Sequence, residues 1–446
     1  MEKKLNLTAY SLIISNVINT IINLFGNTFL VAFFLQVSSE NIPNVALFYI
    51  ITYAVMLTVF PALMALVKKT KRMGIYRVGI VIKCLFILLI ALLKEKITTY
   101  VVVVALFNGL SETFYWCSYN VLKNETMSSK VLMKYQEVYS IINKVVNLVF
   151  PVILGAAIEF SSFLYIAFYV LGFGILQFIS SFFIKNPNAV VDKYHLIEFI
   201  KITKQPDMKP LRDSYVIMFL NGLKAVISTL TTLVIMMTFN SNMSLGVISS
   251  VFSILSILGT FLFFKLYKPE KSKLLYILCG VMPVLATIGM LVSLNKITFI
   301  IFNFIYTICM VTPEFIVDVV KNRTVREVNM HKYICEHQAY SEIFTNLARV
   351  LVYGVLYVMS AFQNAMLFKI FLLIAVISLP ILCLYLYKIE MEMFLFHKAH
   401  REARERKEKE KLENNLHEVL KDESEFALKK EEDVNYMENI NLNETK

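Results

Sequence analysis

The sequence has few cysteines and histidines, and it has no glycine-rich phosphate loop. The six cysteines are scattered among 446 residues without paired spacing, which argues against a disulfide framework. All six histidines lie outside the long apolar stretches, which argues against haem ligation or a histidine-based protease site within a membrane. Without a Walker-type loop, an ATP-driven pump is not expected. No polar segment between the apolar stretches could hold a catalytic domain, so we expect no enzyme, no cofactor and no metal site.

Apolar residues, in contrast, are abundant and occur in long blocks. They make up 57% of the chain, and the mean hydropathy is +0.63, far above that of an ordinary soluble domain. Each block has about 20 residues, enough to cross a bilayer as an α-helix. The first block is too long for the apolar core of a signal peptide, so no cleavable signal is expected. The predicted fold class is an all-α membrane protein with twelve transmembrane helices, at residues 11–35, 45–67, 77–94, 98–122, 137–159, 161–184, 213–239, 243–265, 274–294, 297–320, 338–361 and 364–388.

Basic residues are distributed unevenly between the segments that join these blocks. About two dozen Lys and Arg precede the first block or follow the even-numbered ones, whereas the opposite segments hold only Lys94, Lys96 and Lys296. Because cytoplasmic loops carry the basic excess, we expect both termini in the cytoplasm and the protein in the cell membrane. The formal net charge of +11 then reflects topology and contact with lipid, and it gives no reason to expect a nucleic-acid partner.

The blocks divide into two sets of six that resemble each other. The polar segment between the sets contains DKYHLIEFIKIT, an amphipathic stretch expected to form a short helix on the membrane surface. VLKNE ends the fourth block as VVKNR ends the tenth, which indicates an internal duplication. The predicted domains are an N-terminal six-helix bundle (1–184), a cytoplasmic linker (185–212), a C-terminal six-helix bundle (213–388) and a charged cytoplasmic tail (389–446).

Twelve helices, a six-plus-six parallel repeat, basic cytoplasmic loops and an amphipathic middle loop together resemble the major facilitator superfamily of secondary transporters. The resemblance covers about residues 8–388 and implies two bundles that rock about a midplane site. The family's loop between the second and third helices reads Gly-x-x-x-Asp-Arg-x-Gly-Arg-Lys. Here VKKTKRMGIYR keeps only Arg72 and Gly74, with Val67 at the first glycine and Lys71 at the aspartate. The charge contact that this loop makes in the family is therefore not expected in its usual form.

Four of the predicted helices carry a one-sided stripe of polar residues. The resemblance implies that these four, the first, fourth, seventh and tenth, line a central cavity. In the first, Asn16, Asn19, Asn23 and Asn27 recur at intervals of three and four, which places their amides on one helical face. Such amides either bond helices to each other or face water and substrate, and the recurrence in four helices favours the cavity. The predicted substrate-cavity residues are Asn19, Asn23, Asn108, Glu112, Tyr115, Tyr119, Asn221, Lys224 and Glu314.

A few ionisable residues lie away from the helix ends. Glu112 and Glu314 are acids of the fourth and tenth helices, and Lys144 and Arg349 are bases of the fifth and eleventh. We expect each half to pair its acid with its base, Glu112 with Lys144 and Glu314 with Arg349. Two interpretations stay open, namely static ion pairs that fix helix positions and a switch that loads and releases a proton as the cavity opens and closes. Lys83 is expected to snorkel or to find a partner.

These observations favour a secondary active transporter that moves a small organic solute by alternating access, coupled to protons. Aromatic rings in TFYWCSYN (113–120) suit an amphiphilic compound, which favours export over uptake. We expect a monomer whose basic tail segment, His397 to Lys411, rests on anionic lipid, unless the tail only solubilises the protein. The alternative function is a non-transporting membrane scaffold or sensor that recruits a partner through the charged tail.

Overall fold

The structure is a computed structural model, and it describes most of the chain. The described residues are 7–37, 42–69, 72–126, 129–184, 193–239, 241–266, 272–293, 295–328, 330–362, 369–395 and 406. The chain separates into two compact units, Met1–Ile389 and Glu390–Lys446. Nearly all of the second unit, and with it the predicted lipid-binding part of the tail, lies outside the described residues.

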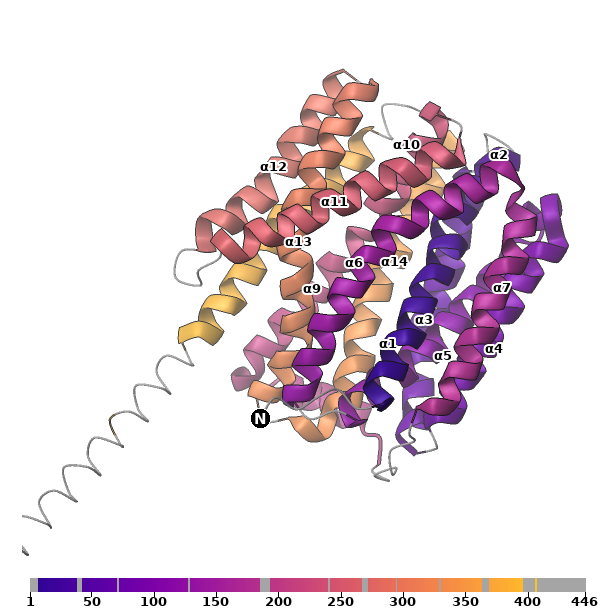
Figure 1. The fold of residues 1–446 in the computed structure, drawn as a ribbon. Helices are drawn as coiled ribbons and strands as arrows, with labels where there is room; N and C mark the ends of the chain where they lie inside the picture. The colour runs from indigo at the N-terminus through magenta and orange to yellow at the C-terminus, as the bar shows by residue number, and fades with distance from the viewer. Residues whose placement is uncertain are drawn as a thin grey trace, which may run out of the picture. The chain divides into compact units, whose positions relative to one another are not determined.

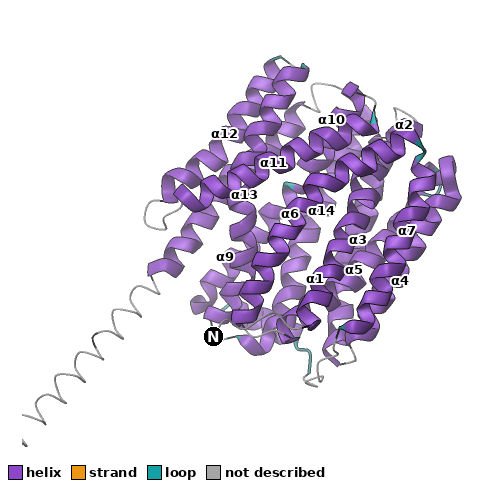
Figure 2. Cartoon of the chain, viewed as in Figure 1, coloured by secondary structure: helices purple, strands orange, loops and turns teal. Residues whose placement is uncertain are grey.

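Every regular element in the described part of the chain is a helix (Figure 2). Twelve helices there are long and apolar enough to cross a membrane, which confirms the predicted all-α membrane fold. The spans lie near their expected positions, at Leu7–Val37, Ile42–Lys69, Arg72–Thr98, Val101–Lys123, Val138–Phe160, Phe163–Phe183, Pro206–Met237, Asn242–Leu262, Ser272–Val292, Lys296–Val325, Ile334–Ser360 and Lys369–Leu395.

The first six spans form the N-terminal half. Their elements are α1 (Leu7–Asn23), the π-helical η1 (Leu24–Phe29), α2 (Leu30–Val37), α3 (Ile42–Lys69), α4 (Arg72–Leu93), η2 (Lys94–Thr98), α5 (Val101–Thr126), α6 (Ser129–Phe160), α7 (Phe163–Ser180) and η3 (Ser181–Phe183). Large apolar side chains such as Phe25, Phe48 and Phe86 are fully buried between these helices. A Cβ at Gly26 would lie 2.9 Å from the Phe86 ring, so the glycine lets α4 approach the π-helical segment closely.

The linker and the last six spans make up the rest of the described structure. Their elements are α8 (Leu196–Thr203), η4 (Pro206–Met208), α9 (Lys209–Leu223), α10 (Ala225–Phe239), α11 (Asn242–Leu266), α12 (Ser272–Val292), α13 (Lys296–Glu327), η6 (His331–Tyr333), α14 (Ile334–Phe362) and the last span, Lys369–Leu395. The short helix expected in the linker is α8. Its Phe199 is fully buried, with ring centroids 5.7 Å from Tyr333 and 6.4 Å from His337, so α8 is docked on the start of α14.

The most extensive contacts between the halves are those of α3 with α14 and of α6 with α11. Figure 1 shows α6 and α11 running side by side. A Cβ at Gly246 would collide with the carbonyl oxygen of Pro151, and one at Gly155 would collide with that of Asn242. Small residues of this kind allow two helix backbones to touch, as is common between membrane helices. The halves therefore meet backbone to backbone along this seam.

Candidate functional site at the middle of the spans

Ionisable residues from both halves gather near the middle of the spans. Glu112 is the central residue of Val101–Lys123. Lys83, Lys224, Glu314 and Arg349 lie within about four residues of the middle of their own spans, or about 6 Å along the helix axis. Charged side chains at this depth are costly unless they are paired or hydrated, and they commonly mark a functional level.

Helices of the first and seventh spans are interrupted near the same level. In the first span, the α-helix gives way to the π-helical η1 before α2 resumes. In the seventh, α9 ends at Leu223 and α10 begins at Ala225, with Lys224 between them. Such interruptions free backbone groups and are frequent at binding sites of membrane transporters. Because the two spans correspond in the predicted repeat, both interruptions point to one central region.

Glu112 of α5 is held by two buried side chains. Its Oε1 accepts a hydrogen bond from Lys83 Nζ of α4, and its Oε2 accepts one from Trp116 Nε1 at 2.7 Å. The side chain of Lys83 is 3% exposed and that of Glu112 is 11% exposed. Each carboxylate oxygen therefore has a donor, and the charge of Glu112 is compensated within the N-terminal half.

In the C-terminal half, Glu314 of α13 forms an ion pair whose carboxylate is more exposed than that of Glu112. Its Oε1 accepts from Lys224 Nζ at 2.8 Å, where the side chain of Lys224 is 12% exposed and that of Glu314 is 58% exposed. A charged group exposed this far within a span would be costly against lipid. We therefore expect the exposed side of Glu314 to face water.

Arg349 of α14 reaches across to the N-terminal half. Its guanidinium carbon lies 4.9 Å from the ring centroid of Tyr53 of α3, and its Nη1 donates to Asn346 Oδ1 at 3.2 Å. One turn before Asn346, Glu342 accepts from Lys321 Nζ at 2.6 Å and from Asn346 Nδ2 at 3.2 Å. Since residues 342, 346 and 349 share one helical face, α14 carries a chain of polar groups that ends on α3.

The predicted pairing of Glu112 with Lys144 is wrong. Glu112 binds Lys83, as the alternative expectation for Lys83 allowed, and Lys144 Nζ donates to Thr260 Oγ1 of α11 at 2.6 Å. Helix α4 packs beside α5, whereas α6 packs against α11 of the other half. Depth along a span could not distinguish these neighbours.

The predicted pairing of Glu314 with Arg349 is also wrong. Lys224, from the interrupted seventh span, donates a hydrogen bond to Glu314, whereas the guanidinium of Arg349 lies over the ring of Tyr53. Helix α13 contacts α9 more extensively than it contacts α14, which explains the choice of partner.

The asparagines of the first span divide between two settings. Asn16 is buried, and it donates to Tyr119 OH at 2.8 Å and accepts from Tyr115 OH at 3.0 Å, so it bonds α1 to α5. Asn19 is buried as well. Asn23 is partly buried, and its Oδ1 is a buried acceptor without a hydrogen-bond partner among the described residues. Asn16 therefore bonds two helices to each other, and cavity lining by Asn19 and Asn23 stays a prediction.

The other predicted cavity residues also differ in burial and in their hydrogen-bond partners. Asn108 is buried, with Nδ2 3.5 Å from Thr52 Oγ1 and an Oδ1 that lacks a partner in the described structure. Tyr115 and Tyr119 are buried in the network around Asn16, and Asn221 is partly buried. Buried amide oxygens without partners are uncommon, so those of Asn23 and Asn108 are available acceptors near the central level.

An ion pair joins the halves at one end of their interface. Lys68, at the end of α3, lies 2.7 Å from Glu336, at the start of α14, and the backbone N–H of His195 donates to the same oxygen at 3.0 Å. The linker and both halves thus meet at one buried carboxylate. Of the loop-motif remnant, Arg72 is buried with its Nε bonded to a backbone carbonyl of α3, and Gly74 is exposed.

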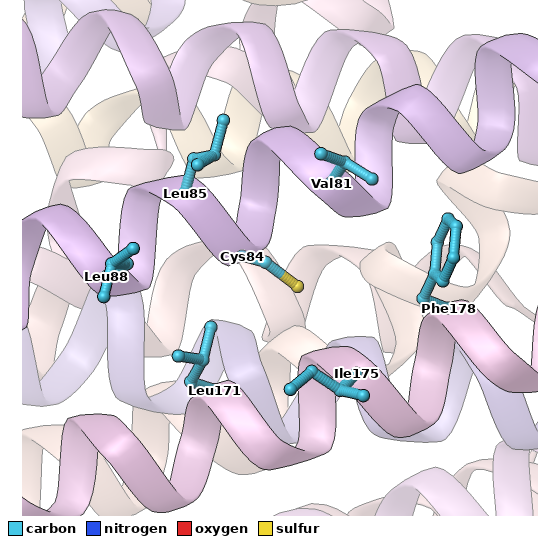
Figure 3. A pocket seen from close by; sticks show the side chains of 7 residues that line it. All are labelled: Val81, Cys84, Leu85, Leu88, Leu171, Ile175 and Phe178. Atoms are coloured by element: carbon cyan, nitrogen blue, oxygen red, sulfur yellow. The ribbon is translucent and has the colours of Figure 1, made fainter.

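An apolar hollow lies between α4 and α7. Figure 3 shows its lining, which consists of Val81, Cys84, Leu85, Leu88, Leu171, Ile175 and Phe178. Because its walls are hydrocarbon apart from one thiol, it suits a lipid chain better than a polar solute. The described residues also contain no group of three or more His, Cys, Asp or Glu side chains placed to hold a metal ion.

Sequence reasoning missed several members of these networks. Glu336 and Glu342 are acids close to the start of the eleventh span, and they were passed over because charges near span ends are ordinarily solvated. The spacing of Glu342, Asn346 and Arg349, at four and three residues, is the same one-sided pattern that identified the other stripes. Tyr53 had no sequence signal, because a tyrosine in an apolar helix is usually core.

By sequence, neither family profiles nor curated proteins give a match. Solved structures do resemble the chain. A bacterial homologue of the iron transporter ferroportin, in its inward-facing state, has a TM-score of 0.61 at 12% identity, over 87% of this chain and 100% of that one. A bacterial metal transporter has a TM-score of 0.56 at 12% identity, over 87% and 99%.

The human organic anion transporter MFSD10 (TETRAN) has a TM-score of 0.57 at 10% identity, over 86% of this chain and 99% of that one. All three of these proteins are named as transporters, and none is named as an enzyme. The protein is a multi-pass membrane protein whose twelve-helix fold is similar to the folds of these transporters, as the resemblance to the major facilitator superfamily implied.

Proposed function

We propose that the chain is a secondary transporter that moves a small organic solute by alternating access, with its site between the two halves at the middle of the membrane. The observation that carries this proposal is the coincidence of interrupted first and seventh spans with ionisable side chains at one level. Backbone breaks and charges inside a membrane are costly, so they persist where a solute pathway uses them. The transporter neighbours support the same class of function.

Thiol accessibility tests this proposal without knowledge of the solute. Single cysteines replace Asn23 or Asn108 in a variant that lacks the six native cysteines, and an impermeant thiol reagent is applied to vesicles of either orientation. An alternating protein should be labelled at both positions from each side, because its cavity opens to both. A cysteine at Leu85, on the apolar hollow, is the control and should react from neither side. Labelling from one side alone would favour the scaffold or sensor alternative.

We propose that Glu112 couples transport to protons. A coupling carboxylate must be exposed to water in one state and shielded in another, and here Glu112 is shielded and bonded to Lys83 and Trp116. Protonation would remove its charge and release Lys83, so that the two helices α4 and α5 could adopt a second arrangement. Lys144 has no direct part in this step.

The remaining assignments rest on the sequence. We propose a monomer in the cell membrane with cytoplasmic termini, on the strength of the basic asymmetry, and export of an amphiphilic compound, on the strength of the aromatic side chains of α5. A cysteine at Ser293 should react with an impermeant reagent from outside intact cells, and one at Ser128 should not. The reverse pattern would invert the topology.

A further inference from the structure

We propose that the transported solute is an organic anion and that Arg349 binds its acidic group. This inference rests on the proposed transport function and specifies the substrate class for the same site.

Most ionic side chains near the centre neutralise one another. Lys83 pairs with Glu112 and Lys224 with Glu314 near the centre, and Lys321 pairs with Glu342 nearer to one end of their spans; none of these pairs carries net charge. Among the described residues, Arg349 and Lys144 are in no ion pair. The side chain of Asp318, an acid nearer to the end of the tenth span, lies outside the described set. The described central region therefore has a surplus of positive charge.

Arg349 is the better placed of these two bases to hold a solute. Its Nε is buried and has no hydrogen-bond partner in the described structure, while its Nη1 uses a neutral amide, Asn346. Glu342 is close enough to interact electrostatically but is already bound to Lys321 at 2.6 Å. A guanidinium has five N–H donors in a planar fork that matches a carboxylate or sulfonate. An anion at Arg349 would supply the missing charge and the missing acceptor together.

The position of Arg349 also links an anion to both halves. The guanidinium lies over Tyr53 of α3 at 4.9 Å, so a group bound to it would contact α3 and α14 at once. A ligand that bridges the two halves can favour one arrangement of them over another, which alternating access requires. Lys144 instead donates to Thr260 at 2.6 Å in the packed seam between α6 and α11.

Aromatic rings beside Arg349 indicate what the rest of the solute is. Tyr49 and Tyr353 stack with ring centroids 4.7 Å apart, and Tyr53 lies 5.7 Å from Tyr353. Glu112 interacts electrostatically with Tyr53 and accepts a hydrogen bond from Trp116, which connects the single tryptophan to this region. Tyr49 and Tyr353 are buried, whereas Tyr53 is partly buried, so Tyr53 is the ring that the cyclic or aromatic body of an anion held by Arg349 would contact.

Trp116 provides the test, because it is the only tryptophan in the sequence. Its fluorescence is measured in purified protein during titration with cyclohexanecarboxylate, cyclohexanecarboxamide and cyclohexylmethylammonium, three probes of similar shape and different charge. We expect the carboxylate to change the emission and to bind at least tenfold more tightly than either of the other two. Equal responses to the three probes, a preference for the cation, or no response to the carboxylate at any soluble concentration would overturn the proposal.

Variants locate the effect. Arg349→Gln should weaken carboxylate binding by tenfold or more, and Arg349→Lys should weaken it less, because the charge remains but the fork is lost. Lys201→Gln, at an exposed position on α8, is the matched control and should bind as the wild type does. If Arg349→Gln does not fold, the charge series on the wild type and Arg349→Lys still decide the matter. Wild-type carboxylate affinity in a folded Arg349→Gln protein would overturn the assignment.

The two proposals can fail separately. Two-sided labelling of the cysteine at Asn108 without anion preference would leave transport standing and reject the substrate class. Anion preference with one-sided labelling would leave an anion-binding site in a protein that does not transport.

Discussion

The two halves each hold an acid–base pair near the middle of their spans, but the pairs differ in burial and in the continuity of the helices that carry them. Lys83–Glu112 lies between continuous helices and is shielded, with Trp116 on the second carboxylate oxygen. Lys224–Glu314 lies at the break between α9 and α10, and the carboxylate is more than half exposed. A shielded pair is expensive to disrupt, whereas an exposed one exchanges protons and partners with water at little cost. The difference in burial favours Glu112 as the carboxylate whose access to water changes during transport, and Glu314 as a residue that faces water in the state described here.

The largest expected effect is on stability. Lys83→Met removes the partner of a buried carboxylate and should destabilise the protein by about 3–5 kcal/mol. Lys224→Met leaves an exposed carboxylate and should cost no more than about 1 kcal/mol. Thermal unfolding of the purified variants in detergent compares the two. Similar losses would show that the pairs are not differently buried in the membrane.

The double variant Lys83→Met with Glu112→Gln sharpens that result. Because both charges are gone, no unpaired buried charge remains, and most of the stability lost in Lys83→Met should return. The same unfolding measurement applies, with Glu112→Gln alone as the reference. If the double variant is no more stable than Lys83→Met, the loss arises from packing of the lysine stem and not from charge.

The next largest expected effect is on the coupling of transport to protons, which we expect to depend on Glu112. Glu112→Gln keeps the size and hydrogen bonding of the side chain but cannot titrate, so it should abolish transport driven by a pH gradient and spare exchange of solute. Glu112→Asp should retain part of the coupling. Proteoliposome uptake of the anion selected by the probe series measures both modes at several pH values. Lys144→Met is the control and should keep wild-type coupling, since Lys144 bonds to Thr260 and not to Glu112. Wild-type gradient-driven rates for Glu112→Gln would leave the pair a static one.

Accessibility is the smallest of the expected effects and the most direct. A cysteine at Glu314 should react rapidly with a soluble thiol reagent in the state described here, and one at Glu112 should react slowly, because their parent side chains are 58% and 11% exposed. Rates are compared in the background without native cysteines. Faster reaction at Glu112 would reverse the assignment of the shielded and water-facing carboxylates.

The sequence by itself determined the number of spans and their approximate ends. Long apolar blocks such as 45–67 can satisfy their backbone groups in a membrane only as helices, so composition and length suffice to place α3. The amphipathic stretch that became α8 was visible for a similar reason, since its periodicity is local. One-sided polar spacing likewise indicated which faces of the first, fourth and seventh spans would be polar.

Only the tertiary structure decided which polar groups meet. Whether Glu112 binds Lys83 or Lys144 depends on whether α4 or α6 lies beside that face of α5, and helix neighbours are set by side-chain packing over distances that sequence spacing does not encode. The same holds for Arg349, whose contact with Tyr53 exists because α14 packs on α3. The interruptions at η1 and Lys224 were also not predicted, because neither segment contains a proline that would mark a break in the helix. The sequence shows which residues are charged or polar, but which of them contact each other depends on how the helices pack.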